Sequence, residues 1–314
     1  MSELRTGSVP VAPAAPSAKA FKGFLLALAG LFLFACMDAS TKYLTAHYNV
    51  PFVVAMRYLI HCGLMLLLLA PRHAGHLVKT RRTGLVVLRA ATLVVSSLCV
   101  GLALQRMPLA ETTAINFLAP MLVMLAASPV LGERIGMLGW LAAGAGFIGV
   151  LLIARPGGGL DSLGVVFALG AVVANTVYQL LSRVLARTEK AVAMLFYTAL
   201  VGSVVFGALL PWSWESDIPS RTELILFGVM GLSAALGHYL FTLAYRYAAA
   251  SLLSPVLYLQ LLWAALLGWV IFGTIPDTLA SLGMLIIIVS GFLMAIKIRG
   301  IGKPAVKNSA GSAS

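Results

Sequence analysis

Three polar side chains share one face of an apolar stretch in the second half of the chain. Asn175, Tyr178 and Gln179 stand three and four residues apart, a spacing that brings side chains together on one face of a helix. Amides and phenols both donate and accept hydrogen bonds without a fixed charge. This face therefore carries groups that can bind a carboxylate and an ammonium on one small molecule. Hydrogen bonding between helices, at about 0.6 kcal/mol per bond, is the alternative role.

Other uncharged polar and aromatic residues stand near the middle of neighbouring apolar stretches. Their hydroxyl, amide and imidazole groups would contact a polar ligand, and Gln260 stands at a similar depth. Phe117 and the other aromatic rings would supply an apolar wall for a ring, with simple packing as the alternative. The predicted substrate-binding residues are Ser96, Ser97, Asn116, Asn175, Tyr178, Gln179, His238, Tyr239, Tyr258 and Trp263.

Ionisable residues also occur within the apolar stretches, where they are costly and are candidates for a function. Asp38 and Lys42 stand four residues apart, and so do Arg57 and His61, so that each pair can meet on one helix face. Both a structural salt-bridge network and a role in gating or coupling fit this spacing. The predicted network comprises Asp38, Lys42, Arg57, His61, Glu111 and Glu133.

Position along each stretch suggests a role for the remaining ionisable residues and for two prolines. Glu111 stands close to the start of its stretch, where a carboxylate complements a helix N-terminus; proton carriage is the alternative. Glu133 falls in a turn and is predicted to make a structural or gating contact. Arg89 is expected to reach the membrane surface with its long side chain. Pro120 and Pro255 interrupt helical hydrogen bonding and are predicted hinges.

The composition specifies the environment that must position these groups. Of 314 residues, 61% are apolar and only 10% are charged, whereas soluble domains are about half apolar and a quarter charged. The sequence therefore predicts an all-α integral membrane protein. The three cysteines all fall within apolar stretches and imply no disulfide or metal site, and no cofactor is expected.

Ten apolar windows are long enough to cross a hydrocarbon core of roughly 30 Å as helices. Short segments with turn residues separate them, among them Pro71-Arg72-His73 and Pro211-Trp212-Ser213-Trp214. No connection is long enough for a soluble domain. The predicted spans are 23–44, 52–70, 84–104, 108–127, 135–154, 162–183, 191–210, 222–244, 250–271 and 278–296.

Most of the net charge of +12 falls on the connections of one side. Lys and Arg are enriched in cytoplasmic loops, so both termini are predicted to be cytoplasmic. This distribution explains the positive charge without nucleic-acid binding. The expected partners are a lipid bilayer and a small-molecule substrate. The alanine-, proline- and serine-rich segment 1–21 and the segment 300–314 are predicted to be cytoplasmic tails, the first of them disordered.

The segment from Leu104 to Arg155 returns in outline near the C-terminus. Gln105-Arg106 corresponds to Tyr245-Arg246, and Leu131-Gly132 to Phe272-Gly273. Two five-span units, 22–155 and 156–299, follow. An odd number of crossings inverts the second unit, and inverted repeats are typical of transporters that alternate access to a shared site at the membrane midplane.

The chain resembles the EamA-type members of the drug/metabolite transporter superfamily. The resemblance rests on ten spans in two inverted halves, Pro120 within the fourth span and the LGER turn at 131–134. Ser-Thr-Lys at 40–42 and Met-Arg-Tyr at 56–58 add to it. The second half has Phe272-Gly273-Thr274 where the first has the acidic turn, so the glutamate has no symmetric counterpart.

Within that family the chain is most similar to bacterial inner-membrane exporters of aromatic amino acids. This resemblance implies a central cavity lined by the first, third, fourth, sixth, eighth and ninth spans. It also implies export of aromatic or other neutral amino acids from the cytoplasm. No phosphate-binding G-x-x-x-x-G-K-[ST] motif occurs, so the energy would come from a gradient.

Other functions and assemblies remain open from the sequence. A multidrug carrier and a nucleotide-sugar carrier are alternatives within the same class; the latter would need basic residues facing the cavity. An intramembrane enzyme is the alternative from another class, but no HExxH or GxSxG motif occurs. Closely spaced small residues such as Ala142 and Gly146 in the fifth span favour packing within one chain over a dimer interface.

Overall fold

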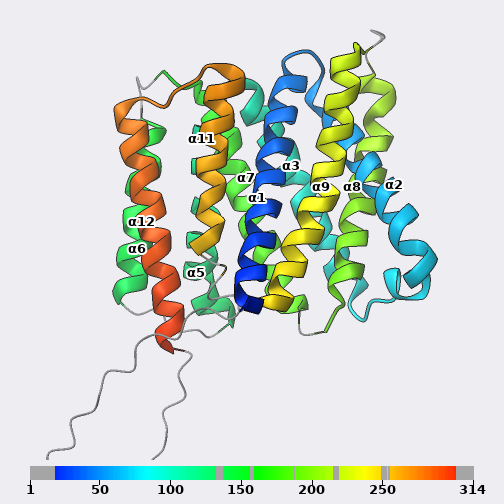
Figure 1. The fold of residues 1–314 in the computed structure, drawn as a ribbon, viewed down its shortest axis with the longest axis horizontal. Coiled ribbons are helices and arrows are strands. Elements are labelled where there is room, and N and C mark those ends of the chain that lie inside the picture. The colour runs from blue at the N-terminus through cyan, green and yellow to red at the C-terminus, as the bar shows by residue number, and fades with distance from the viewer. Residues whose placement is uncertain are drawn as a thin grey trace, which may run out of the picture.

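The structure is a computed structural model, and it describes residues 18–131, 137–155, 159–186, 188–214, 219–248, 253 and 255–301. These residues form a bundle of helices without a strand, which confirms the all-α prediction (Figure 1). The predicted tails lie mostly outside the described residues, and Glu133 lies wholly outside them.

The helices run up and down between two ends of the bundle, and α1 begins at the end where α12 finishes (Figure 1). The elements are α1 (Ala18–Thr45), α2 (Val50–Leu77), α3 (Thr83–Arg106), α4 (Leu109–Asn116), α5 (Leu118–Leu131), α6 (Met137–Ile153), α7 (Ser162–Leu185), α8 (Ala191–Ser213), α9 (Arg221–Tyr247), η1 (Pro255–Tyr258), α11 (Leu259–Phe272) and α12 (Thr278–Ile301).

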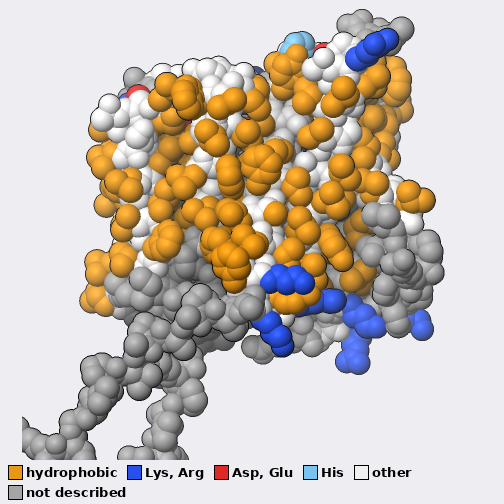
Figure 2. Space-filling view, viewed as in Figure 1, with side chains coloured by type: hydrophobic (Ala, Val, Ile, Leu, Met, Phe, Trp, Pro, Cys, Tyr) orange, Lys and Arg blue, Asp and Glu red, His pale blue; other side chains and the backbone are white. Residues whose placement is uncertain are grey.

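The outside of the bundle is apolar, as a lipid environment requires. In the described residues, six helices are long and apolar enough to cross a membrane, and four further apolar segments of 10–17 residues accompany them. Figure 2 shows hydrophobic side chains over most of the visible face, with most visible Lys and Arg along its lower edge. The protein is therefore a multi-pass membrane protein, whereas the number of ten spans stays a prediction.

Helix packing repeats when the two halves of the chain are exchanged. The first helix of the first half, α1, packs on α9, and its counterpart α7 packs on α3. In the same way α3 packs on α8 and α9 packs on α2. The remaining large contacts, α2 with α8 and α6 with α12, join counterparts directly. Corresponding helices such as α1 and α7 run in opposite directions along the bundle (Figure 1).

Two prolines predicted to lie in turns lie in helices in the structure. Pro71 lies within α2, and Pro211 lies within α8. A proline removes a single helical hydrogen bond, and in a membrane bundle neighbouring groups compensate for it. The prediction of a turn at Pro71 was therefore wrong, and the helix break predicted at Pro211 comes three residues later, at Trp214. By contrast, Pro51 stands at the start of α2, where the missing amide hydrogen would have had no helical partner.

A glycine contact brings α6 and α12 close together. A Cβ on Gly149 would lie 2.7 Å from the carbonyl oxygen of Gly283 and 2.9 Å from Cγ1 of Ile287. The backbones touch because neither glycine has a side chain, as in small-residue packing between membrane helices. The small residues of the fifth predicted span thus include one that packs inside the chain.

We expect Gly149→Leu to lower the free energy of unfolding by about 1–3 kcal/mol, because the new side chain overpacks this contact. Gly144→Leu is the matched control: it lies on the same helix, and nothing lies within 4 Å of its Cβ position. Thermal unfolding in detergent measures both. Equal melting temperatures for the two variants would contradict the close contact.

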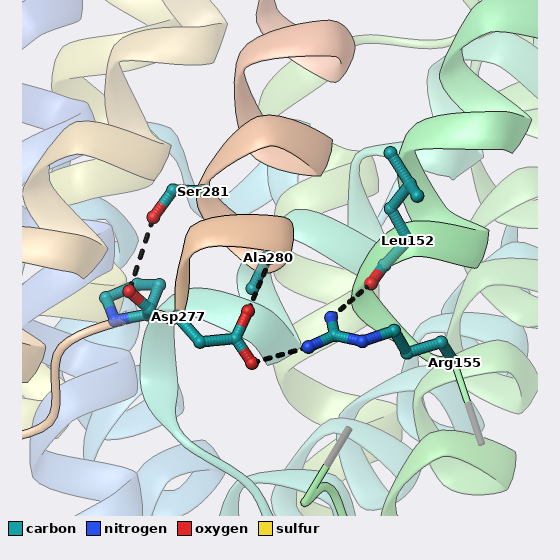
Figure 3. Close-up of polar contacts among 6 residues, drawn as sticks. Leu152, Arg155, Asp277, Ala280 and Ser281 are labelled. Atoms are coloured by element: carbon teal, nitrogen blue, oxygen red, sulfur yellow. Dashed lines mark hydrogen bonds and ion pairs between the residues drawn. The ribbon is translucent and has the colours of Figure 1, made fainter. Parts of the chain in front are cut away.

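An ion pair joins the ends of α6 and α12 outside the spans. Arg155 donates to the Asp277 carboxylate at 2.7 Å and to the carbonyl of Leu152 at 2.7 Å. Asp277 also accepts from the Ala280 backbone amide at 2.8 Å and so caps α12 (Figure 3). The Ala280 amide, followed by Arg155, lowers the pKa of Asp277 below its usual value.

The lowered pKa makes the stabilising contribution of Asp277 depend on pH. A folded-state pKa below the unfolded value gives stability that is present above the unfolded pKa, near 3.8, and is lost as the pH falls through the folded pKa. We therefore expect Asp277→Asn to lower the melting temperature at pH 7 and to have a smaller effect near pH 3. A difference from wild type that stays constant over this range would contradict the charge-based role.

Candidate functional site

Polar residues from α1, α2 and α9 meet inside the bundle. The rings of His61 on α2 and His238 on α9 stack with centroids 5.9 Å apart, and Phe34 on α1 meets the His238 ring edge-on at 4.8 Å. His61 is buried, whereas Asp38 and His238 lie deep among the helices and still keep some accessible surface. Residues of the predicted binding set and of the predicted network therefore belong to one cluster.

Arg57 lies at the centre of this cluster and is only 7% exposed. Its guanidinium lies 5.2 Å from the ring centroid of Tyr58 and interacts electrostatically with Asp38, His61 and His238. Asp38 lies near the side chain of Gln260 on α11. In the described part of the chain, ion pairs within 4.0 Å occur at Arg106–Asp161 and Arg155–Asp277, so Arg57 and Asp38 are close but not in direct contact.

Tyr58 links the cluster to α3. Its hydroxyl lies 2.8 Å from Oγ of Ser97, and its ring stacks on Phe206 of α8. A Cβ at Gly202 would fall on the Tyr58 ring, so the ring occupies the space that this glycine leaves. Sequence reasoning did not select Tyr58 as a site residue, because a tyrosine beside an arginine has no distinctive spacing.

Arg89 is buried, at 4% exposed, and does not reach the membrane surface. Its Nε donates to Oγ of Ser182 at 2.6 Å, and its Nη2 donates to the Tyr178 hydroxyl at 2.7 Å. Its Nη1 donates to the Met194 carbonyl and to Oγ1 of Thr198. The prediction of a surface-reaching side chain was wrong, because hydroxyls on α7 and α8 satisfy the guanidinium where it is buried.

Lys42 does not pair with Asp38 as its spacing suggested. Its Nζ donates to the carbonyls of Leu104, at 3.0 Å, and Met107, at 2.7 Å, at the C-terminal end of α3. Terminal helix carbonyls lack helical partners and attract cations, so the two acceptors account for its position. The pairing prediction failed because these acceptors come from another helix.

Glu111 stands in the first turn of α4, as predicted, and is 6% exposed. It interacts electrostatically with Lys42 on α1 and with Asp277. Its Oε2 is buried without a hydrogen-bond partner in the described residues. The carboxyl group also contacts its own backbone amide, which fits a role at the helix N-terminus.

The two predicted hinges stand at breaks in helices, and these breaks lie side by side. Helix α4 ends at Asn116, four residues before Pro120, where the proline cannot donate to the Asn116 carbonyl. Pro255 opens the 3-10 turn η1 that precedes α11. The rings of Phe117 and Tyr258, one from each break, are 5.0 Å apart.

Trp263, one turn further along α11, has a buried indole Nε1 without a hydrogen-bond partner in the described residues, and its ring meets Phe32 edge-on at 5.0 Å. This indole N–H is therefore an unsatisfied donor enclosed within the bundle.

The other predicted binding residues divide into three groups. Ser96 and Asn116 bond to backbone carbonyls, of Ala171 and Thr112 respectively, and so connect or stabilise helices. Asn175 and Gln179 are half-buried on α7. Tyr239 is 55% exposed, so the structure does not bring it together with the others inside the bundle.

Comparisons with known proteins agree with this architecture. The model of the EamA-like transporter family matches residues 21–155 and again residues 162–296. A solved crystal structure covers 92% of this chain and 100% of its own chain, with a TM-score of 0.63 and 17% identity, and supports the fold alone.

Curated relatives carry the names of transporters with different substrates. The S-adenosylmethionine uptake transporter of Rickettsia felis is 26% identical over 80% of this chain and 84% of its own length. The pseudopaline exporter of Pseudomonas aeruginosa is 26% identical over 85% of this chain and 94% of its own length. The riboflavin transporter of Rhizobium johnstonii is 30% identical over 64% of this chain and 67% of its own length. The chain belongs to the EamA-like transporter family.

Proposed function

We propose that this transporter exports small amphipathic metabolites, and specifically aromatic or other neutral amino acids, from the bacterial cytoplasm by alternating access. The observation that carries the carrier mechanism is the packing pattern that recurs on exchange of the two halves. Two similar units of opposite direction can exchange conformations and so open one site to either side. In this proposal the four shorter apolar segments also cross the membrane, giving ten spans in two inverted repeats, 22–155 and 156–299.

The chemistry of the interior supports an amphipathic substrate. The buried rings of Phe117 and Tyr258 pack together at the two helix breaks, and the indole N–H of Trp263 has no hydrogen-bond partner among the described residues. Asn175 and Gln179 on α7 supply uncharged donors and acceptors. Such a combination suits a molecule with an apolar ring and a polar backbone. The hinges proposed for the exchange of conformations are the breaks at Pro120 and Pro255.

The distribution of basic residues supports an orientation with both termini in the cytoplasm. Exposed Lys and Arg at the end where α1 begins outnumber those at the other end, where Arg106 and Arg221 are exposed. With relatives from bacteria, this favours the inner membrane as the location. The exposed basic residues at the first end are Lys19, Lys22, Lys79, Arg81, Arg82, Arg183, Lys190 and Arg246.

The direct test is uptake into proteoliposomes of purified protein. Labelled tryptophan, phenylalanine and a cationic drug are supplied separately, each with and without a pH gradient. We expect saturable uptake of the amino acids, competition between them, and no uptake of the drug. Transport of the drug alone would replace the amino-acid proposal with the multidrug alternative. A strict requirement for the pH gradient would make Glu111 and Asp38 candidates for proton coupling.

A further inference from the structure

Among the residues whose burial the structure describes, Arg57 and Arg89 are the buried arginines, and they differ in how many of their donors the protein uses. Arg89 donates to four oxygen acceptors on α7 and α8. Arg57 is also buried, at 7% exposed, and its guanidinium lies 5.2 Å from the ring centroid of the neighbouring Tyr58. A guanidinium carries five N–H donors. Arg57 therefore keeps donors that nothing in the described residues uses.

The free donors of Arg57 are also accessible. The side-chain nitrogens and oxygens that are fully buried without a partner, within the described residues, are Glu111 Oε2 and Trp263 Nε1. The nitrogens of Arg57 are not among them, so those without a partner border an accessible space. Asp38 and His238 border such a space as well, because each lies deep in the bundle and is only half-buried.

A buried cation without a partner at this depth is costly in free energy unless an anion pairs with it. Asp38 does not supply that anion directly, since no ion pair within 4.0 Å joins it to Arg57 in the described chain. The two opposite charges are instead close enough to interact but more than 4.0 Å apart. A ligand that carries both charges can satisfy both groups at once.

We propose that Arg57 binds the carboxylate of a zwitterionic substrate, whose ammonium group faces Asp38 and Gln260. The assignment rests on the proposed amino-acid transport and places its polar contacts. The planar fork of arginine matches a carboxylate in a bidentate geometry. His61 and His238, stacked beside it, add ring nitrogens that can hydrogen-bond to the same group. The substrate ring would then extend toward α11, which carries both Gln260 and Trp263.

Matched pairs of ligands test the site independently of which amino acid is transported. Binding to purified protein in detergent is followed by ligand-induced thermal stabilisation, with tryptophan against tryptophanamide and 3-phenylpropionate against 3-phenylpropionamide. We expect each acid to bind more tightly than its amide. Arg57→Gln should raise the Kd of both acids about 10- to 100-fold and abolish the preference, and Arg57→Lys should lie between. Asp38→Asn should raise the Kd of tryptophan and leave the Kd of 3-phenylpropionate unchanged.

Arg106→Gln is the control, because it removes an exposed arginine outside the cluster and should leave every Kd unchanged. Acids and amides that bind equally, or an Arg57→Gln variant that binds acids as wild type does, would overturn the assignment. Amino-acid transport without this preference would overturn it and leave the proposed function standing. Binding of 3-phenylpropionate that depends on Arg57, with no binding of amino acids, would support the carboxylate site and overturn amino-acid export.

Discussion

Arg89→Ala is expected to lower the free energy of unfolding by roughly 3 kcal/mol. The substitution removes four hydrogen bonds to α7 and α8, each worth about 0.6 kcal/mol in a membrane bundle, and also the packing of a buried side chain. The hydroxyls of Ser182 and Thr198 lose the donated bond from Arg89 but keep their own bonds to the carbonyls of Tyr178 and Met194. The expected observation is a lower melting temperature in detergent and a smaller yield of monodisperse protein.

Arg106→Ala provides a matched control on the same helix. Arg106 is 39% exposed, and its ion pair with Asp161 measures 3.7 Å, so its loss should cost less than about 1 kcal/mol. Arg89→Met, which keeps much of the volume without the donors, should fall between Arg89→Ala and wild type. Equal stability of Arg89→Ala and Arg106→Ala would contradict the role of Arg89 as a link between three helices.

Pro120→Ala is expected to slow transport at least about tenfold and to stabilise the protein by about 1–3 kcal/mol. An alanine restores the amide that can donate to the carbonyl of Asn116, where α4 now ends, and a proline inside a helix costs about 3 kcal/mol. A continuous helix would remove the break beside Phe117 and Tyr258 that the proposed exchange of conformations uses. Stability gained at the expense of activity is the expected combination.

Transport and melting temperature are to be measured on the same preparations. Pro51→Ala is the control, since Pro51 stands at the start of α2 and interrupts no helical bond. If Pro120→Ala transports at the wild-type rate, the proposal that Pro120 is a hinge is contradicted. Slower transport together with lower stability would indicate damage to packing rather than the loss of a hinge.

The helices follow from the sequence because lipid forces backbone groups to bond within each segment. Apolar windows therefore indicate where helices lie, and Pro120 correctly marks a break, since the missing amide acts on the residue four positions earlier. Pro71 carries the same chemical signal but lies within continuous helix, and Pro211 lies in the last turn of α8. Whether neighbouring helices compensate for a proline depends on packing that one segment does not encode.

The candidate site shows the same division between local and distant information. Spacing within one helix predicts which side chains share a face, but the partners of Lys42 and Arg89 come from other helices. Lys42 bonds to carbonyls 62 and 65 residues away, and no pattern of side chains marks those acceptors. The exposure of Tyr239 next to the enclosed His238 depends likewise on how α9 is rotated in the bundle.

Counterflow tests the central proposal, a carrier of amino acids with alternating access, most directly. Proteoliposomes are loaded with unlabelled tryptophan and diluted into a trace of labelled tryptophan. The proposal predicts transient accumulation of label above its external concentration, because one site returns loaded from each side. Uptake that only equilibrates, and at a rate unaffected by the internal tryptophan, would contradict it.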